Sequence, residues 1–88
     1  MDSTFSRSSD AYAVEMDGEY VMMGREQGAY FSLADVAAAI WEELETPKSL
    51  QQLVDSLLTK FDVTPDECKR ETSIFLDELL DNGLVIAL

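Results

Sequence analysis

The sequence of 88 residues has no histidine, one cysteine and only 6 Lys or Arg residues. Without histidine, the chain has no imidazole for acid–base catalysis, for activating a nucleophile or for binding a metal. A single cysteine, Cys68, closes no internal disulfide, so nothing requires an oxidising compartment and we expect a cytoplasmic protein. No apolar run approaches the roughly 20 residues that cross a bilayer, and the first residues lack the features of an export signal. We therefore expect no association with a membrane.

Acidic residues dominate the charge: 18 Asp or Glu against 6 Lys or Arg give a formal net charge of −12. Such a surface repels phosphate backbones, which bind proteins through Lys and Arg, so nucleic acid is not an expected partner. The apolar share of 47% suffices for the core of one small domain. We expect that domain to be a monomer or a weak dimer.

The N-terminal half predicts extended structure. Residues 1–10, MDSTFSRSSD, are polar apart from Phe5, and we expect a flexible tail or at most an outer edge strand. Residues 11–88 then form a single domain. In its first strand, residues 11–16, the side chains of Tyr12, Val14 and Met16 fall on one parity, with Glu15 on the other, and are predicted to form the buried face.

Two more strands follow. Asp17-Gly18 is a strong hairpin signal, because both residues tolerate a positive φ. Residues 19–23 are apolar on both parities, which predicts a central strand, and 29–31 form the third strand after a turn bracketed by glycines. The result is a three-stranded antiparallel meander.

Three helices are predicted from capping signals and apolar spacing. The first spans residues 33–45, with Ser32 as its N-cap and Pro47 beyond its end. The second begins at a capping box made by Ser49 and Gln52. The third begins with Thr64 as N-cap and Pro65 at its first position.

The third helix ends at Asn82-Gly83, a left-handed C-cap signature. The apolar residues 84–88 that follow are expected to be extended and buried. The order of elements predicts an α+β fold, a winged helix-turn-helix-like arrangement of a three-stranded antiparallel sheet followed by three helices.

Catalysis is not indicated. Neighbouring carboxylates occur in pairs on the helices, but each pair lies on the polar side of its helix, which is typical of solvated surface. No calcium-binding loop or phosphate-binding loop is present, and Cys68 lies on the apolar stripe of the third helix, where a thiol is usually inert. We therefore expect neither a cofactor nor a metal. The pairs are Glu42 and Glu43, Asp66 and Glu67, and Asp77 and Glu78.

Two sets of residues have both a structural and a binding interpretation. Trp41, Met22 and Met23 are expected in the core, although methionines exposed at a surface would favour an adaptable binding face. A helix-turn-helix arrangement suggests DNA binding, but Lys69 and Arg70 are outnumbered by carboxylates on the third helix, so the phosphate-positioning charges are missing.

The third strand has a free edge if the strands pair in chain order. Residues 28–32, GAYFS, contain no Pro or Lys to block pairing, and the third helix is placed to form one wall of a groove beside them. A peptide added as a further strand and a plain structural edge both fit this pattern.

The chain contains EYVMMGREQGAYFSL at residues 19–33, Ala37 and IWEEL at 40–44, and spaced apolar positions in the later helices through Gly83-Leu84-Val85. In this order, these residues resemble the pyrroloquinoline quinone biosynthesis protein D family. The resemblance extends from about residue 11 to residue 85. Most of these positions belong to the core, and their ordered combination is specific.

The resemblance implies a function. Members of this family are not enzymes; they bind the leader of a ribosomally made precursor peptide as an extra strand on the third strand, beside the third helix. A free-standing chain of this kind looks most like the leader-binding half of the split B proteins of lasso peptide biosynthesis, whose partners are a leader peptidase of transglutaminase-like fold and an ATP-dependent cyclase. Carried onto this sequence, the peptide-binding residues are Gly28, Ala29, Tyr30, Phe31, Ser32, Cys68, Lys69, Thr72, Phe75 and Leu76, with Ile74 as a possible replacement on the helix.

Two alternatives remain at the level of the sequence. The same module serves as a peptide chaperone for a radical enzyme in cofactor biosynthesis, and the chain alone does not distinguish these pathways. A second class of function is a structural subunit that docks on a basic protein through its charge of −12.

Overall fold

The computed structural model describes residues 3–9, 11–24 and 30–88. It confirms a mixed α+β fold with antiparallel sheets and three helices. The winged helix-turn-helix assignment stays a prediction. Within the described residues, no helix is long and apolar enough to cross a membrane. The elements are β1 (Thr4–Arg7), β2 (Ala13–Met16), β3 (Glu19–Met23), β4 (Tyr30–Leu33), α1 (Val36–Glu43), β5 (Lys48–Ser49), α2 (Leu50–Lys60), α3 (Pro65–Asp81) and β6 (Val85–Ala87).

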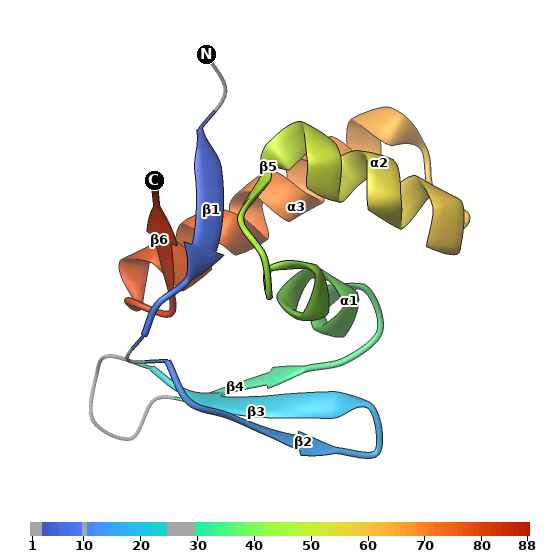
Figure 1. Cartoon of the computed structure of the whole chain (residues 1–88). Coiled ribbons are helices and arrows are strands. Elements are labelled where there is room, and N and C mark those ends of the chain that lie inside the picture. The colour runs from blue at the N-terminus through green and yellow to red at the C-terminus, as the bar shows by residue number, and fades with distance from the viewer. Residues whose placement is uncertain (1–2, 10, 25–29) are drawn as a thin grey trace.

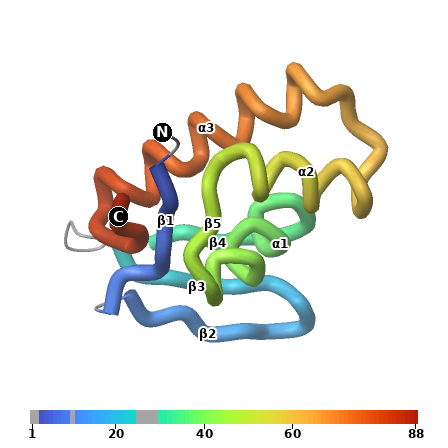
Figure 2. Tube along the Cα trace, turned by 45° about the horizontal axis from the view of Figure 1, so that its top comes forward, coloured from blue at the N-terminus to red at the C-terminus, as the bar shows by residue number. Residues whose placement is uncertain are grey.

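The strands form two sheets on different sides of the helices. One sheet has the order β2-β3-β4 and the other β5-β1-β6, and both are antiparallel. In Figure 1, α1 lies between the β2-β3-β4 sheet and the pair α2 and α3, while β1 and β6 run side by side at one flank. Figure 2 shows the same arrangement with α3 extended along one side of the molecule.

The β2–β3 hairpin forms as predicted. Asp17 has φ 55° and Gly18 φ 83°, the positive values that a tight two-residue turn requires. This turn pairs Met16 with Glu19 and Ala13 with Met22. As predicted, β3 is the central strand of its sheet.

The predicted buried face of β2 is wrong. Tyr12, Val14 and Met16 are exposed, whereas Ala13 packs against the core opposite the buried Met22. The turn sets the pairing register, and residues directly opposite one another in an antiparallel pair lie on the same face. With Met22 facing the core, Ala13 must do so too, and the larger apolar side chains point outward.

Residues 4–7 are neither a loose tail nor an outer edge strand. β1 is the middle strand of its sheet: Thr4 pairs with Ser49 of β5, and Arg7 pairs with Val85 of β6. The Arg7 guanidinium lies 4.6 Å from the centre of the Trp41 ring, and its Nε and Nη2 donate to the Trp41 carbonyl oxygen at 3.0 and 2.6 Å. Phe5 packs against the core. The partners are at least 34 residues away in sequence from Arg7, and so no local pattern in residues 1–10 indicates them.

The first helix begins later than predicted. β4 continues through Leu33, which pairs with Tyr20 and is buried, so Ser32 is a strand residue and not an N-cap. α1 starts at Val36 after Asp35, whose φ of 53° turns the chain between strand and helix without a side-chain capping bond. Burial of Leu33 as a residue of β4 stabilises the strand more than a cap at Ser32 would stabilise an earlier helix start.

The caps of α2 and α3 are confirmed. Ser49 and Gln52 form the reciprocal capping box, and the Thr64 hydroxyl accepts a hydrogen bond from the Glu67 amide at 3.3 Å. Gly83, with φ 71°, follows the end of α3.

The core lies where α1, α2 and α3 meet β3, β4 and β6. Trp41 is buried, as predicted, and so are Leu84 and Val85. Ile86 and Leu88 are exposed, which corrects the prediction that the whole C-terminal segment is buried. Alternation along β6 explains the exposure of Ile86, because neighbouring strand residues point to opposite faces. The fully buried side chains include Met22, Ile40, Leu44, Leu53, Leu57, Thr72, Leu79 and Val85.

Candidate functional site

One edge of β4 is unpaired within the described part of the chain. β4 lies at the end of the order β2-β3-β4 and pairs only with β3, through Tyr20–Leu33 to Met23–Tyr30. Its other edge therefore presents main-chain N–H and C=O groups that can accept a further strand. Gly28 and Ala29, which the sequence placed in this segment, lie outside the described residues.

Side chains of β4 alternate between two faces. Phe31 lies opposite Met22 and packs against the core, whereas Tyr30 and Ser32 are exposed on the outer face of the sheet. Tyr30 is one of the residues that the family resemblance places at or beside the peptide-binding groove. The register instead places it beside Met23, facing away from the helices, so only its backbone belongs to the candidate edge.

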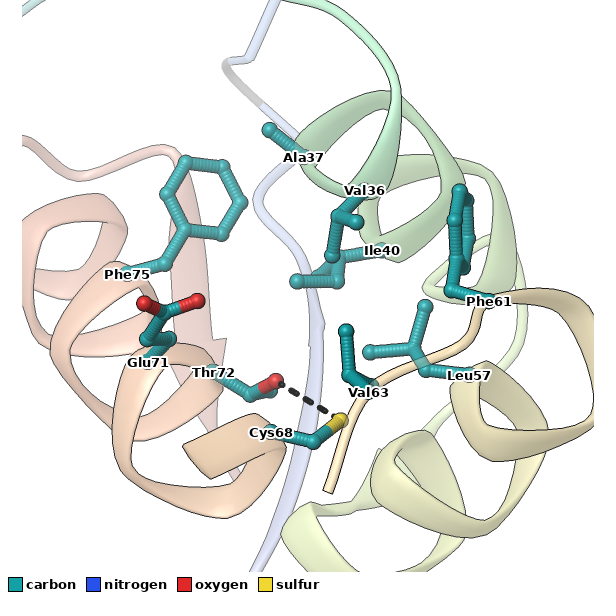
Figure 3. Close-up of a pocket in the computed structure, with 10 residues that line it drawn as sticks. All are labelled: Val36, Ala37, Ile40, Leu57, Phe61, Val63, Cys68, Glu71, Thr72 and Phe75. Atoms are coloured by element: carbon teal, nitrogen blue, oxygen red, sulfur yellow. Dashed lines mark hydrogen bonds between the residues drawn. The ribbon is translucent and has the colours of Figure 1, made fainter. Parts of the chain in front are cut away.

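A cavity of about 210 Å³ opens between α1 and α3, close to the end of α2 (Figure 3). Val36 and Ala37 belong to the first turn of α1, which begins three residues after β4 ends. The cavity is smaller than the about 300–1,000 Å³ typical of small-molecule sites, so its size suits one or two side chains. Its walls are formed by Val36, Ala37, Ile40, Leu57, Phe61, Val63, Cys68, Glu71, Thr72 and Phe75.

The helix residues predicted for the site divide into two groups. Cys68, Thr72 and Phe75 line the cavity, as Figure 3 shows. Leu76 is buried in the core and Lys69 is exposed, and neither contributes to the cavity wall. Ile74, the suggested replacement, is also exposed and lies outside the cavity wall.

The opposite wall of the cavity is not among the site residues predicted from the sequence. Val36, Ala37 and Ile40 of α1 face α3 across it, and Phe61 and Val63 close one end (Figure 3). The spacing of Val36, Ala37 and Ile40 indicates a helix face turned toward other elements. That spacing does not show which other helix the face meets, or whether the contact leaves a gap.

The cavity is largely apolar inside and acidic at its border. Cys68 and Thr72 are buried, with 3.9 Å between Sγ and Oγ1, so each side chain has a polar neighbour within the wall. Glu71 is exposed and is the one charged residue among the described lining residues. Such a cavity can hold an apolar side chain supplied by a bound peptide. The other carboxylates of α3 lie outside the cavity wall and are exposed on the helix surface.

Two pKa values are shifted near α1. Burial, with the nearby carboxylates of Glu42 and Glu15, raises the pKa of Tyr20 above its usual value. Hydrogen bonds from Lys60 and Ser56 lower the pKa of Glu43, whose Oε2 lies 3.1 Å from Lys60 Nζ. The Glu43–Lys60 pair joins the end of α1 to the end of α2, beside the elements that line the cavity.

The lowered pKa of Glu43 predicts a pH-dependent contribution to stability. The ion pair stabilises the fold above the ordinary carboxyl pKa of 4.5, and this stabilisation is lost as the pH falls through the lower pKa of the folded state. We expect Lys60→Met to lower the free energy of unfolding by about 0.2–1 kcal/mol at pH 7 and by less at pH 3. Urea unfolding at both values measures this.

A matched control for this variant is Lys69→Met, which removes the same charge from an exposed lysine that forms no ion pair within the described residues. Equal losses of stability for the two variants at pH 7 would show that the Glu43–Lys60 pair contributes nothing specific.

The family is established by sequence. The model of the family described as coenzyme PQQ synthesis protein D (PqqD) matches residues 19–85. The chain therefore belongs to the PqqD family, and the predicted resemblance is confirmed. No curated protein matches the chain.

Two solved structures share this fold. TbiB1 in complex with the TbiA(beta) leader peptide is 28% identical in sequence, with a TM-score of 0.79 over 91% of this chain and 93% of that one. A lasso peptide synthetase B1 complexed with the leader peptide is 22% identical, with a TM-score of 0.76 over 93% and 96% of the two chains. The second likeness concerns the fold alone.

Proposed function

We propose that this protein is a non-catalytic adaptor of lasso peptide biosynthesis, which binds the leader segment of a ribosomally made precursor peptide. The leader adds as a strand to the open edge of β4, beside α3. The adaptor then delivers the precursor to a leader peptidase of transglutaminase-like fold and to an ATP-dependent cyclase. Membership of the PqqD family and the likeness to TbiB1, which was solved with a leader peptide, support this proposal.

The observation that carries the proposal is the combination of an open strand edge with an apolar cavity. β4 pairs on one side only within the described chain, and the cavity begins at the first turn of the next helix. Main-chain pairing supplies affinity for any extended peptide, and a pocket for particular side chains supplies specificity. In the proposed complex, one apolar leader side chain occupies the cavity between α1 and α3.

The proposal is tested by titrating the purified protein with a labelled leader peptide of its precursor, with the core peptide of the same precursor as the control. We expect saturable binding of the leader alone that changes little between low and moderate salt, because strand addition depends little on charge. Absence of leader binding, or equal binding of the core peptide, would contradict the proposed function.

The cavity makes a separate prediction. Ala37→Leu places extra methyl groups in the space between α1 and α3, so the leader side chain no longer fits and we expect the Kd for the leader to rise about tenfold or more. Fluorescence anisotropy measures this, with thermal unfolding to establish that the variant folds.

Ala87→Leu is the control, because it makes the same change at an exposed position of β6, away from the cavity. A folded Ala37→Leu variant that binds the leader as tightly as Ala87→Leu does would show that the cavity takes no part in leader binding.

A second candidate is a peptide chaperone for a radical enzyme of cofactor biosynthesis, which the description of the matched family as coenzyme PQQ synthesis favours. The edge of β4 and the cavity serve both functions equally well. Titration with a lasso leader and with a PQQ precursor peptide, side by side, separates them, since each function predicts binding of only one of the two peptides.

A further inference from the structure

The outer face of the β2-β3-β4 sheet is apolar and uncovered by other described elements. It consists of alternate residues from each strand, which the register places on one side: Val14 lies opposite Val21, and Met23 lies opposite Tyr30. Most of these side chains are largely open to solvent; Tyr12 is 74% exposed and Tyr30 is 68% exposed. We define the outer sheet face as the apolar Val14, Met16, Val21, Met23 and Tyr30, the exposed Tyr12 just before β2, and the polar Glu19 and Ser32 on the same side.

The composition of the outer sheet face is unusual for a surface exposed to water. Apolar side chains exposed singly are common, but a contiguous group on one face of a sheet marks an interaction site in a folded protein. Tyrosine and methionine are among the residues enriched in the centres of protein interfaces. β2 contributes to this face although its only residue packed against the core is Ala13, so burial inside this domain does not explain its apolar side chains.

Among the residues that the structure describes, the charges at the outer sheet face have one sign. Glu19 lies on the outer sheet face as the cross-strand partner of Met16, and Asp17 is in the adjoining turn. Arg7 contacts Trp41, on the other side of the sheet from this face. Lys48 donates to the Glu43 carbonyl oxygen, and Lys60 forms an ion pair with the Glu43 carboxylate. The other described basic residues are on α3. Within the described residues, therefore, no Lys or Arg belongs to the β2-β3-β4 sheet, and its border is acidic.

This charge pattern indicates which kind of partner fits the outer sheet face. A second copy placed face to face would bring like charges together and join two chains of net charge −12. A protein whose apolar patch is bordered by Lys and Arg complements both the centre and the border of the face. Complementary charge also speeds encounter and rejects acidic partners.

We propose that the outer sheet face docks a folded protein partner whose own apolar patch is bordered by Lys and Arg. The inference rests on the proposed function, which identifies this partner as an enzyme that modifies the precursor, the leader peptidase or the cyclase. The leader occupies the free edge of β4 and the enzyme occupies the face of the same sheet, so one adaptor holds both at once. The precursor is thereby presented next to the enzyme that acts on it.

The test measures binding of the purified leader peptidase and of the purified cyclase to the full chain by biolayer interferometry. The double variant Val14→Thr/Met16→Lys keeps a β-branched residue in β2 and places a positive charge on the face at the turn end of β2. We expect the Kd for the docking enzyme to rise about tenfold or more, with unchanged binding of the leader.

The matched control is Ile86→Thr/Leu88→Lys, which makes the equivalent changes near the C-terminus. Val14 and Ile86 are each 44% exposed, and Met16 and Leu88 are 63% and 64% exposed. We expect this control to bind the enzyme as the unaltered protein does. In a second pair, Glu19→Lys should weaken docking more than Asp66→Lys, which makes the same change in net charge at the start of α3.

The outcomes are separable. Failure of both enzymes to bind, or equal effects of the two double variants, would overturn the docking surface. Sedimentation showing that the unaltered chain dimerises and that Val14→Thr/Met16→Lys does not would assign the face to a second copy and also overturn it. The leader titration is a separate measurement. If the unaltered protein does not bind the leader, the proposed function is contradicted. The docking surface is tested by the enzyme titration alone.

Discussion

Deleting residues 1–8 is expected to abolish cooperative folding of this domain or to lower its free energy of unfolding by about 3–5 kcal/mol, as for the loss of a buried aromatic residue. The deletion removes β1 from the middle of its sheet and leaves both β5 and β6 without a partner strand. The deletion also removes Phe5, which is partly buried against the core, and the contacts of Arg7 with Trp41. A small domain has a total stability of only about 5–15 kcal/mol, so this loss is a large fraction of it.

Urea unfolding followed by circular dichroism measures this effect. The control is deletion of residues 1–3, which precede β1 and leave its pairing residues in place. We expect this shorter deletion to change stability by less than about 1 kcal/mol. If the chain without residues 1–8 unfolds with the same midpoint as the full chain, β1 contributes nothing to the fold in solution.

Proline in β4 is expected to weaken leader binding strongly at one of two neighbouring positions. Adjacent strand residues direct their N–H groups to opposite edges, so one of Phe31 and Ser32 donates toward β3 and the other toward the open edge. Proline at the open-edge position removes a donor that the leader needs and adds a ring in its path. We expect a rise in Kd of about tenfold or more there, with the β3–β4 pairing intact.

The pair Phe31→Pro and Ser32→Pro includes its own control. Replacing the residue whose N–H points to β3 should destabilise the fold. Replacing the residue whose N–H points to the open edge should leave the protein folded but with strongly weakened binding of the leader. Leaders N-methylated at alternate residues provide a check that does not depend on folding of the variants, since only one of the two alternating sets should block pairing. Unchanged leader affinity in both proline variants and for both methylated sets would exclude strand addition on β4.

The local elements of this fold were predictable because their causes lie within a few residues. The Asp17-Gly18 turn needs only two residues that tolerate positive φ, and the caps at Ser49 and Thr64 need only an oxygen close to the next free amides. The start of α1 was predicted wrongly at Ser32, because burial of Leu33 in β4 depends on its pairing with β3.

Long-range pairing decided the rest. β1 forms because residues 48–49 and 85–87 provide a partner strand on each of its sides. The polar composition of residues 1–10 does not indicate these distant partner strands. The C-terminal segment likewise pairs with β1, which leaves Ile86 exposed instead of buried. The candidate site was predicted in part, because Cys68, Thr72 and Phe75 share one side of α3. The opposite wall at Val36 and Ala37 depends on how α1 and α3 pack.

By itself, the sequence determined the acidic charge, the absence of histidine chemistry, the central strand β3, the caps of α2 and α3, and the membership of the PqqD family. Only the tertiary structure decided which face of β2 meets the core. A turn of two residues sets the register, and a strand with side-chain period two then has no freedom to choose its buried face. That constraint turned Tyr12, Val14 and Met16 toward solvent, where they form the outer sheet face.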